Sequence, residues 1–247
     1  MRGIYMDYTY LYSTRIQKTF DEDQADILSV LKSELDKKKK LEVHLINYYK
    51  GMPVSFKAQL VDVDKDALDL DISPQQAVAI SSEHYTFIRS KLFKHDILAK
   101  AQYVNIRRKA VSLRKLCYVE IMAERRNHLR LILEPPINAI FNSAAGVVTG
   151  KIVELSMAGA RMVVEQPCDE VIGQEAKLSM MMSDIGQDTS FNITLPAKIV
   201  TISDDIKPIQ LMFSITPDLL TDRLISKYLI QRQIEIIREI KDASGLD

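Results

Sequence analysis

The sequence has no tryptophan, only two cysteines and no apolar run of transmembrane length. The cysteines, Cys117 and Cys168, are too few for a disulfide scaffold and fit a reducing compartment. The first 15 residues lack the continuous apolar core of a signal peptide, so we expect a cytoplasmic protein without a membrane span. The 33 basic and 33 acidic residues give zero net charge, which disfavours a protein committed to nucleic acid in general.

Recognisable catalytic and metal-binding motifs are also missing. The four histidines are scattered without the spacing of metal ligands. Ser156 has no GxSxG elbow around it and no visible base. The segment GVVTGKI, 146–152, is one residue short of a phosphate-binding loop and lacks its terminal hydroxyl. We therefore expect neither an enzyme nor a protein that carries a metal or a cofactor.

The sequence does contain enough apolar residues for two cores, because 47% of its 247 residues are hydrophobic. Residues 21–40 have apolar side chains at helical spacing, acids at the start and lysines at the end, which predicts a surface helix. From residue 41 the apolar period changes to two, and turn residues separate short alternating segments, which predicts a small antiparallel barrel. The strand candidates are 41–51, 54–64, 67–72, 84–93, 96–106 and 111–122.

The second half of the chain repeats this pattern and ends with a helical one. A hairpin loop is expected at 183–190, and Pro217 and Gly245 delimit a long C-terminal helix. The strand candidates are 147–155, 160–166, 176–182, 191–202 and 209–215. The apolar side of the helix is expected to consist of Leu220, Leu224, Leu229, Ile230, Ile234 and Ile237.

These patterns predict a mainly β protein with two small antiparallel barrels, an N-terminal helix and a long C-terminal helix. The predicted domains are 1–122 and 123–247. Positive charge is concentrated where they join, since residues 105–130 hold eight basic residues and two glutamates.

Three arginines lie at this junction, in the segment AERRNHLRLIL. Arg126 and Arg130 are spaced RxxxR, so in a tight turn or a short helical stretch they would lie on neighbouring sides of one turn, next to Arg125. Guanidinium groups make paired hydrogen bonds to phosphate and to the O6 and N7 edge of guanine. The alternative interpretation is a basic linker whose arginines pair with acids of either domain.

A second polar motif, ELSMAG, follows at 154–159 between two predicted strands. Glu154 can accept hydrogen bonds from a base edge such as guanine N1–H and N2–H₂, and Ser156 can donate or accept. Gly159 permits a turn with positive φ or a close backbone approach to a ligand. Alone, ExSxxG is only a polar turn between strands, but an RxxxR motif at the start of the same barrel makes the signal much stronger.

The order RRNHLR and then ELSMAG resembles the two-part signature of the PilZ domain, RxxxR followed by (D/N)xSxxG. VIGQEAKLSMMM, AKIVTI and IQLMFSI resemble later strands of that domain, and ISKYLIQRQIEIIREI is similar to the helix that often closes it. The resemblance covers residues 123–243. The first half of the chain is similar, in pattern and order, to the barrel that precedes PilZ in YcgR-like flagellar-brake proteins.

The resemblance implies a receptor for the bacterial second messenger cyclic di-GMP. Arg126 and Arg130 would hold phosphates and guanine edges with help from Arg125. The turn of Glu154, Ser156 and Gly159 would read guanine. Ligand would pull the 123–130 linker onto the second barrel, change the angle between the domains and expose a surface for a protein partner. The flagellar motor or another envelope machine is the expected partner, with recruitment to the flagellar basal body.

Position 154 departs from the signature, because it holds Glu where the pattern has Asp or Asn. The carboxylate extends one methylene further and can overshoot the guanine edge. The alternative is therefore a degenerate PilZ-like adaptor that binds proteins but no cyclic di-GMP. A third hypothesis is single-stranded nucleic-acid binding. It would need aromatic side chains among the basic residues on which bases can stack, and the sequence offers only Tyr103 and Tyr118 there.

Overall fold

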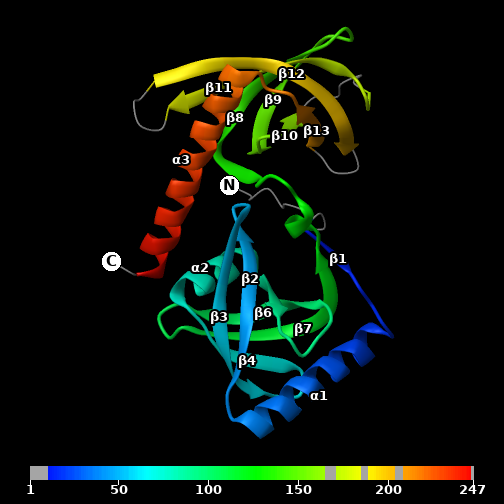
Figure 1. Ribbon diagram of the computed structural model, residues 1–247, viewed down its shortest axis with the longest axis vertical. Helices are drawn as coiled ribbons and strands as arrows, with labels where there is room; N and C mark the ends of the chain where they lie inside the picture. Colours follow the sequence, from blue (N-terminus) through cyan, green and yellow to red (C-terminus); the bar gives the residue numbers. More distant parts are fainter. Residues whose placement is uncertain (1–10, 165–170, 185–188, 204–207, 246–247) are drawn as a thin grey trace. The chain divides into compact units, whose positions relative to one another are not determined.

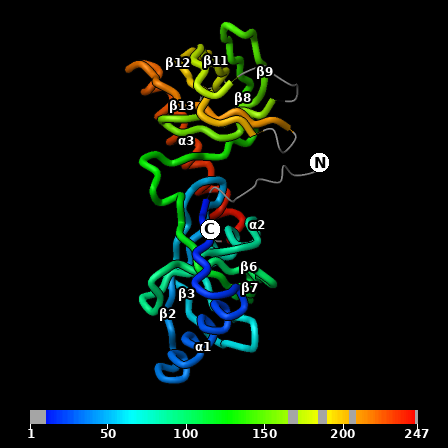
Figure 2. The backbone as a smooth tube through the Cα atoms, turned by 90° about the vertical axis from the view of Figure 1, so that its right-hand side faces the viewer, coloured from blue at the N-terminus to red at the C-terminus, as the bar shows by residue number. Residues whose placement is uncertain are grey.

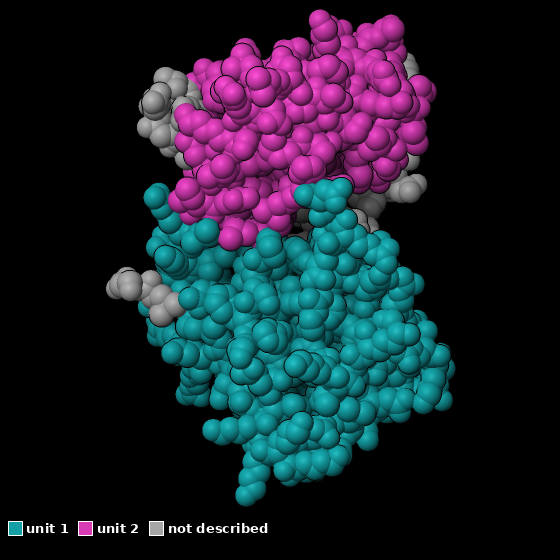
Figure 3. All heavy atoms as spheres, viewed as in Figure 1, with its two compact units in different colours: residues 1–49, 53–127, 237–247 teal, residues 50–52, 128–236 magenta. Residues whose placement is uncertain are grey.

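The structure is a computed structural model that describes residues 11–164, 171–184, 189–203 and 208–245. The chain divides into two compact units (Figure 3). Unit 1 consists of residues 1–49, 53–127 and 237–247, and unit 2 of residues 50–52 and 128–236. Each unit contains its own antiparallel strands, and the predicted mainly β class with helices near both ends is confirmed (Figure 1). The predicted domain boundary between residues 122 and 123 stays a prediction.

The described strands of unit 1 form a seven-stranded antiparallel sheet in the order β1-β7-β4-β3-β2-β5-β6. A further pairing of β7 with β6 closes six of these strands into a ring, and Figure 2 shows β6 and β7 side by side. The bounds are β1 Tyr12–Thr14, β2 Leu41–Tyr49, β3 Met52–Val63, β4 Ala67–Asp71, β5 Tyr85–Arg89, β6 Asp96–Asn105 and β7 Ala110–Ile121.

The period-two pattern explains this ring, because alternate apolar residues of its strands are buried in two clusters. The larger cluster contains Leu45, Ile97 and Leu113. The smaller one surrounds Phe87, which Tyr48 and Tyr85 contact edge-on. The candidate 84–93 forms a strand only over β5, five residues long.

The predicted N-terminal helix is confirmed as α1, Phe20–Lys38. Its N-cap Thr19 accepts a hydrogen bond from the backbone N–H of Glu22, and acids fill the first turn. Lys39 ends the helix in the left-handed conformation. The apolar stripe, which includes Ile27 and Leu31, is buried in the larger core cluster.

A second helix, α2, Pro74–Glu83, was not predicted. Ser73 caps it by accepting a hydrogen bond from the N–H of Gln76, and Pro74 stands in the first turn. Ala77 and Ile80 are fully buried. The Ser-Pro start was the available signal, but the ten-residue segment lies between strand candidates and is too short for a strong helical period.

Six described strands of unit 2 form a closed antiparallel barrel in the order β10-β13-β12-β11-β8-β9. The core contains Phe141, Ile152, Met162, Leu178 and Leu211, which are all fully buried. The bounds are β8 Leu131–Asn142, β9 Val147–Leu155, β10 Gly159–Val164, β11 Glu175–Asp184, β12 Thr189–Ser203 and β13 Ile209–Ile215. The second predicted barrel is thus confirmed. Half of the expected hairpin loop, residues 185–188, lies outside the described residues, as does Cys168.

The C-terminal helix is confirmed as α3, Leu219–Ser244, with Gly245 at positive φ beyond its end. The expected apolar side is only partly right. Leu229 is buried, but Leu220 and Ile230 are 68% and 53% exposed, and Ile234 and Ile237 are also exposed. The buried stripe is rotated relative to the predicted one and includes Ile225, Tyr228, Leu229, Arg232, Ile236 and Ile240. None of the described helices is long and apolar enough to cross a membrane.

Candidate ligand-binding site

The residues predicted to bind ligand belong to both units. Arg125 and Arg126 lie in unit 1, at the end of the 3₁₀ helix η2, Met122–Arg125. The other residues lie in unit 2, with Arg130 just before β8 and the ExSxxG residues along β9 and the turn into β10. Because η2 ends at Arg125 and Arg126 is extended, with φ −81° and ψ 134°, the helical geometry considered for RxxxR is wrong.

Arg125 forms an ion pair with an acidic neighbour in unit 1. Its guanidinium donates to Oε1 of Glu120, and Arg15 donates to Oε2 of the same carboxylate. Close by in sequence, Glu124 accepts a hydrogen bond of 2.8 Å from Arg89. The pairing of Arg125 with an acid is what the basic-linker interpretation predicted for it.

Ser156 shapes the turn between β9 and β10. Its hydroxyl donates to the carbonyl oxygen of Gly159 at 3.1 Å and accepts from the N–H of Ala158 at 3.4 Å. Its backbone N–H also donates to the Gly159 carbonyl, at 2.8 Å. The side chain is only 3% exposed. The hydroxyl expected to meet a ligand is therefore engaged in holding the turn.

Gly159 is required for close packing, not for a positive φ. Its φ is outside the left-handed region, and a Cβ atom there would lie 2.8 Å from the carbonyl oxygen of Phe213. Gly159 pairs with Ser214 at the start of β10, so the close approach is to the neighbouring strand β13. The expected approach to a ligand is thus replaced by an approach to the barrel's own backbone.

Glu154 has a buried partner that the sequence reasoning missed. Its Oε2 accepts a hydrogen bond of 2.7 Å from Nη2 of Arg161, which stands opposite it in the register of β9 and β10. Glu154 and Arg161 are each only 6% exposed. The signal was present in ELSMAGAR, because two residues that flank a tight strand-to-strand turn at matching distances become cross-strand neighbours.

Arg130 is the one predicted arginine that lies near the turn within unit 2. Its Nη1 is 3.8 Å from Oε1 of Glu154, and its side chain is 43% exposed. The distance is too long for a good hydrogen bond. Two guanidiniums therefore face one carboxylate, and the trio of Arg130, Glu154 and Arg161 carries a net positive charge that favours an anion at the barrel's edge.

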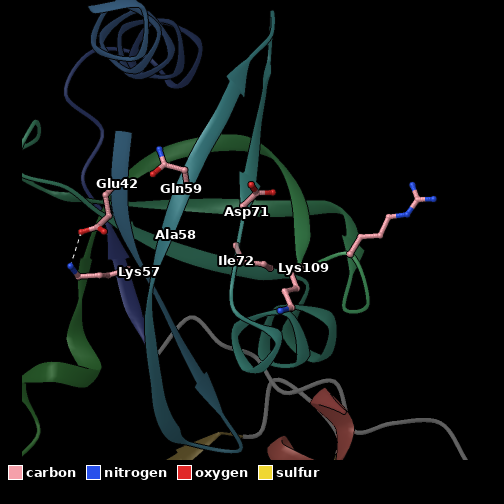
Figure 4. Close-up of a pocket in the computed structure, with 8 residues that line it drawn as sticks. Glu42, Lys57, Ala58, Gln59, Asp71, Ile72 and Lys109 are labelled. Atoms are coloured by element: carbon pink, nitrogen blue, oxygen red, sulfur yellow. Dashed lines mark ion pairs between the residues drawn. The ribbon is translucent and has the colours of Figure 1, made fainter. Parts of the chain in front are cut away.

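A recess of about 420 Å³ lies elsewhere, in unit 1 (Figure 4). Lys57 donates to Glu42 across it at 2.9 Å. Because both acidic and basic side chains line it, its charge does not favour a ligand of one sign. Its lining residues are Glu42, Lys57, Ala58, Gln59, Asp71, Ile72, Arg108 and Lys109. Among the residues that the structure describes, no group of three or more metal-ligating side chains gathers into a metal site.

The fold and motifs of unit 2 define a small antiparallel barrel preceded by an arginine-bearing segment and edged by an ExSxxG turn. This is the organisation of one domain family in particular. The model of the PilZ domain family matches residues 124–231, and the C-terminal part of the chain is a PilZ domain.

Three solved proteins are similar over most of the chain. YcgR of Escherichia coli, in complex with c-di-GMP, is 16% identical with a TM-score of 0.41, over 92% of this chain and 99% of that chain. MrkH of K. pneumonia, in complex with c-di-GMP, is 15% identical with a TM-score of 0.45, over 92% and 99%. Another MrkH structure is described as a c-di-GMP-dependent transcription regulatory factor.

The third is the Bacillus subtilis inhibitor of motility MotI/DgrA, which is 12% identical with a TM-score of 0.42, over 79% of this chain and 97% of that chain. No curated protein matches the chain. The assignment of the C-terminal domain rests on the family model and on the motif residues.

Proposed function

We propose that this protein is a receptor for cyclic di-GMP that regulates a protein partner. The observation that carries the proposal is the meeting of the two halves of the motif in unit 2. Arg130, from RxxxR, comes within 3.8 Å of Glu154, from ExSxxG, at the edge of a PilZ barrel. A guanidinium and a base-edge acceptor are thus side by side at the edge of one barrel, as a ligand with guanine and phosphate requires.

Each motif residue has a role in this proposal. Arg130 and Arg126 hold the phosphates and the O6 and N7 edges of guanine, and Arg125 assists. Glu154 accepts hydrogen bonds from guanine N1–H and N2–H₂. Ser156 and Gly159 act indirectly, because their hydrogen bonds and close packing keep the turn in shape.

Ligand binding would bring the arginines of the linker and the turn of the barrel to one dinucleotide. Arg125 would then exchange the carboxylate of Glu120 for a phosphate. Such a switch changes the arrangement of the chain only if the ligand binds one arrangement better than the other. The regulated partner in this proposal is the flagellar motor or another envelope machine.

A second candidate is an interaction module that binds no ligand. The internal ion pairs favour this candidate, since Glu154 is paired with Arg161 and Arg125 is paired with Glu120. A surface whose charges already have partners inside the protein has less need of an anionic ligand.

Calorimetric titration of the full chain with cyclic di-GMP separates the two candidates. We expect saturable binding at micromolar concentrations or below, lost in the variant Arg126→Ala/Arg130→Ala. The matched control is Arg108→Ala, which removes an exposed arginine from the turn between β6 and β7 and should bind like the parent. No heat from the intact protein would leave the interaction module as the better description.

A further inference from the structure

We propose that Arg161 is a positioning residue of the cyclic di-GMP site, which makes a glutamate at position 154 able to read guanine. The inference rests on the function proposed above. It concerns an arginine outside both parts of the motif, on the strand that follows the ExSxxG turn.

The first support is the way in which Arg161 is held. Its Nη2 donates to Oε2 of Glu154 at 2.7 Å, and its Nη1 approaches Oε1 of Gln210, on β13, at 3.4 Å. The guanidinium is therefore fixed by side chains of the strands on both sides of β10. A planar guanidinium anchored in this way can orient one carboxylate oxygen with little freedom.

The second support is a break in the strand pairing. The register of β10 against β9 shifts between Arg161 and Met162, and three consecutive residues, Ala160, Arg161 and Met162, are buried. Regular alternation would bury only every second residue. A bulge re-aims side chains, and here it allows a charged residue to be buried next to the apolar core residue Met162.

The pair explains why a longer acid is tolerated at position 154. Side chains of directly opposed residues start about 5 Å apart, and the glutamate reaches back across this gap to Arg161. The methylene that would make Glu154 overshoot a guanine edge is thus used to reach its partner. An aspartate would be one methylene shorter and would leave the guanidinium of Arg161 with a weaker contact.

The two arginines around Glu154 then have separate tasks. Arg161 binds Oε2 in the barrel wall, whereas the more exposed Arg130 is 3.8 Å from Oε1. A contact of that length is easily exchanged. When ligand binds, Arg130 turns to a phosphate and Oε1 becomes the acceptor for guanine, while Arg161 keeps the carboxylate in place.

The test is the preference for guanine, measured by titrating the full chain with cyclic di-GMP and with cyclic di-AMP. Adenine presents an acceptor at N1 where guanine presents a donor, so an oriented carboxylate distinguishes them. We expect Arg161→Met to weaken cyclic di-GMP binding at least tenfold and to reduce the guanine preference by a similar factor. Glu154→Asp should weaken cyclic di-GMP binding. Compared with Arg161→Met, Arg161→Lys should restore part of the affinity and part of the guanine preference.

The matched control is Arg232→Met, which removes another buried arginine of unit 2, one that donates to the carbonyl of Ile132 and to Glu235. It should lower the melting temperature and leave the guanine preference as in the parent. If Arg161→Met does not fold, the affinities of Arg161→Lys and Glu154→Asp for cyclic di-GMP and cyclic di-AMP test the inference instead, and both variants should bind cyclic di-GMP more weakly than the parent.

The outcomes separate this inference from the proposed function. If the parent binds and these variants keep its guanine preference, Arg161 is merely structural and the inference is overturned alone. Stronger binding by Glu154→Asp would also overturn it, because the glutamate would then be a defect. If the parent binds neither dinucleotide, the proposed receptor function fails and the inference fails with it.

Discussion

Glu83 in unit 1 and Glu154 in unit 2 are the buried glutamates of the described chain, with exposed fractions of 7% and 6%. Their surroundings differ in charge. Glu154 has an arginine at 2.7 Å, whereas the hydrogen bonds found at Glu83 come from neutral groups. The same side chain, buried to the same degree, is therefore stabilised in two different ways.

The surroundings of Glu83 form a small neutral network. Nδ2 of Asn47 donates to Glu83 Oε2 at 2.7 Å, and the backbone N–H of Tyr48 donates to it at 3.4 Å. Nε2 of Gln76 in turn donates to Asn47 Oδ1 at 2.7 Å. Burial raises the pKa of Glu83 to about 7, although the hydrogen bonds from Asn47 and Tyr48 act in the opposite direction.

The comparison shows that the partner of a buried acid decides what the acid can do. A buried acid without a cation can take up a proton, and then serves only the packing of its domain. A buried acid beside an arginine has a partner for its charge, and its second oxygen can accept hydrogen bonds from a ligand. Of the two, Glu154 is the one suited to recognition.

The largest effect is expected from removing the cation of the charged site. Arg161→Met leaves the buried carboxylate with only the long contact to the exposed Arg130 and should lower the free energy of unfolding by about 3–5 kcal/mol in a urea titration. Adding Glu154→Gln to Arg161→Met should recover most of this loss, because a neutral amide needs no counter-charge. A single variant within 1 kcal/mol of the parent, or a double variant as unstable as the single one, would contradict the strong coupling of the pair.

The second-largest effect is expected at Glu83, as a dependence of the free energy of unfolding on pH. The folded pKa of Glu83, about 7, is above the ordinary value of 4.5, so its contribution to stability is fully present below pH 4.5 and is lost as the pH rises through 7. The full difference amounts to about 3 kcal/mol. Glu83→Gln mimics the protonated acid.

Melting temperatures of parent and Glu83→Gln at pH 5 and pH 8 check this expectation. The variant should match the parent at pH 5 and exceed it at pH 8. Subtracting the two curves removes the contribution of the groups that the two proteins share. Parallel curves from pH 5 to pH 8 would show that Glu83 is charged throughout.

The sequence was sufficient for the architecture because the apolar period is a local property. Period two located most strands of both barrels but missed β1 and β8, and helical spacing located α1 and α3. The rotation of the α3 stripe was beyond reach, since Ile230 is as apolar as Ile225 and only the packing of the barrel decides which one is buried. The short helix α2 has its cap and proline in the sequence but too few turns to show a period.

At the candidate site, spacing identified residues but not what they contact. Ser156 and Gly159 are in the turn, as expected, yet their hydrogen bonds and packing are internal to the barrel. The pairing of Arg161 with Glu154 could have been predicted from the spacing around the turn, but the burial of Arg161 depends on a register shift in β10, which no pattern in a single sequence predicts. Whether the motif residues bind ligand stays a prediction for the titrations above.

The smallest effect is expected where an ion pair is exposed, which sharpens the contrast with Glu154. The side chains of Arg125 and Glu120 are 60% and 29% exposed, so Glu120→Gln should change the free energy of unfolding by less than about 1 kcal/mol. Its effect on binding should have the opposite sign to that of Arg161→Met. Loosening Arg125 makes it available to a phosphate, so cyclic di-GMP affinity should rise about two- to fivefold at low salt and approach the parent value at high salt. Unchanged affinity at low salt would remove Arg125 from the proposed ligand contacts and leave it as a partner of Glu120 alone.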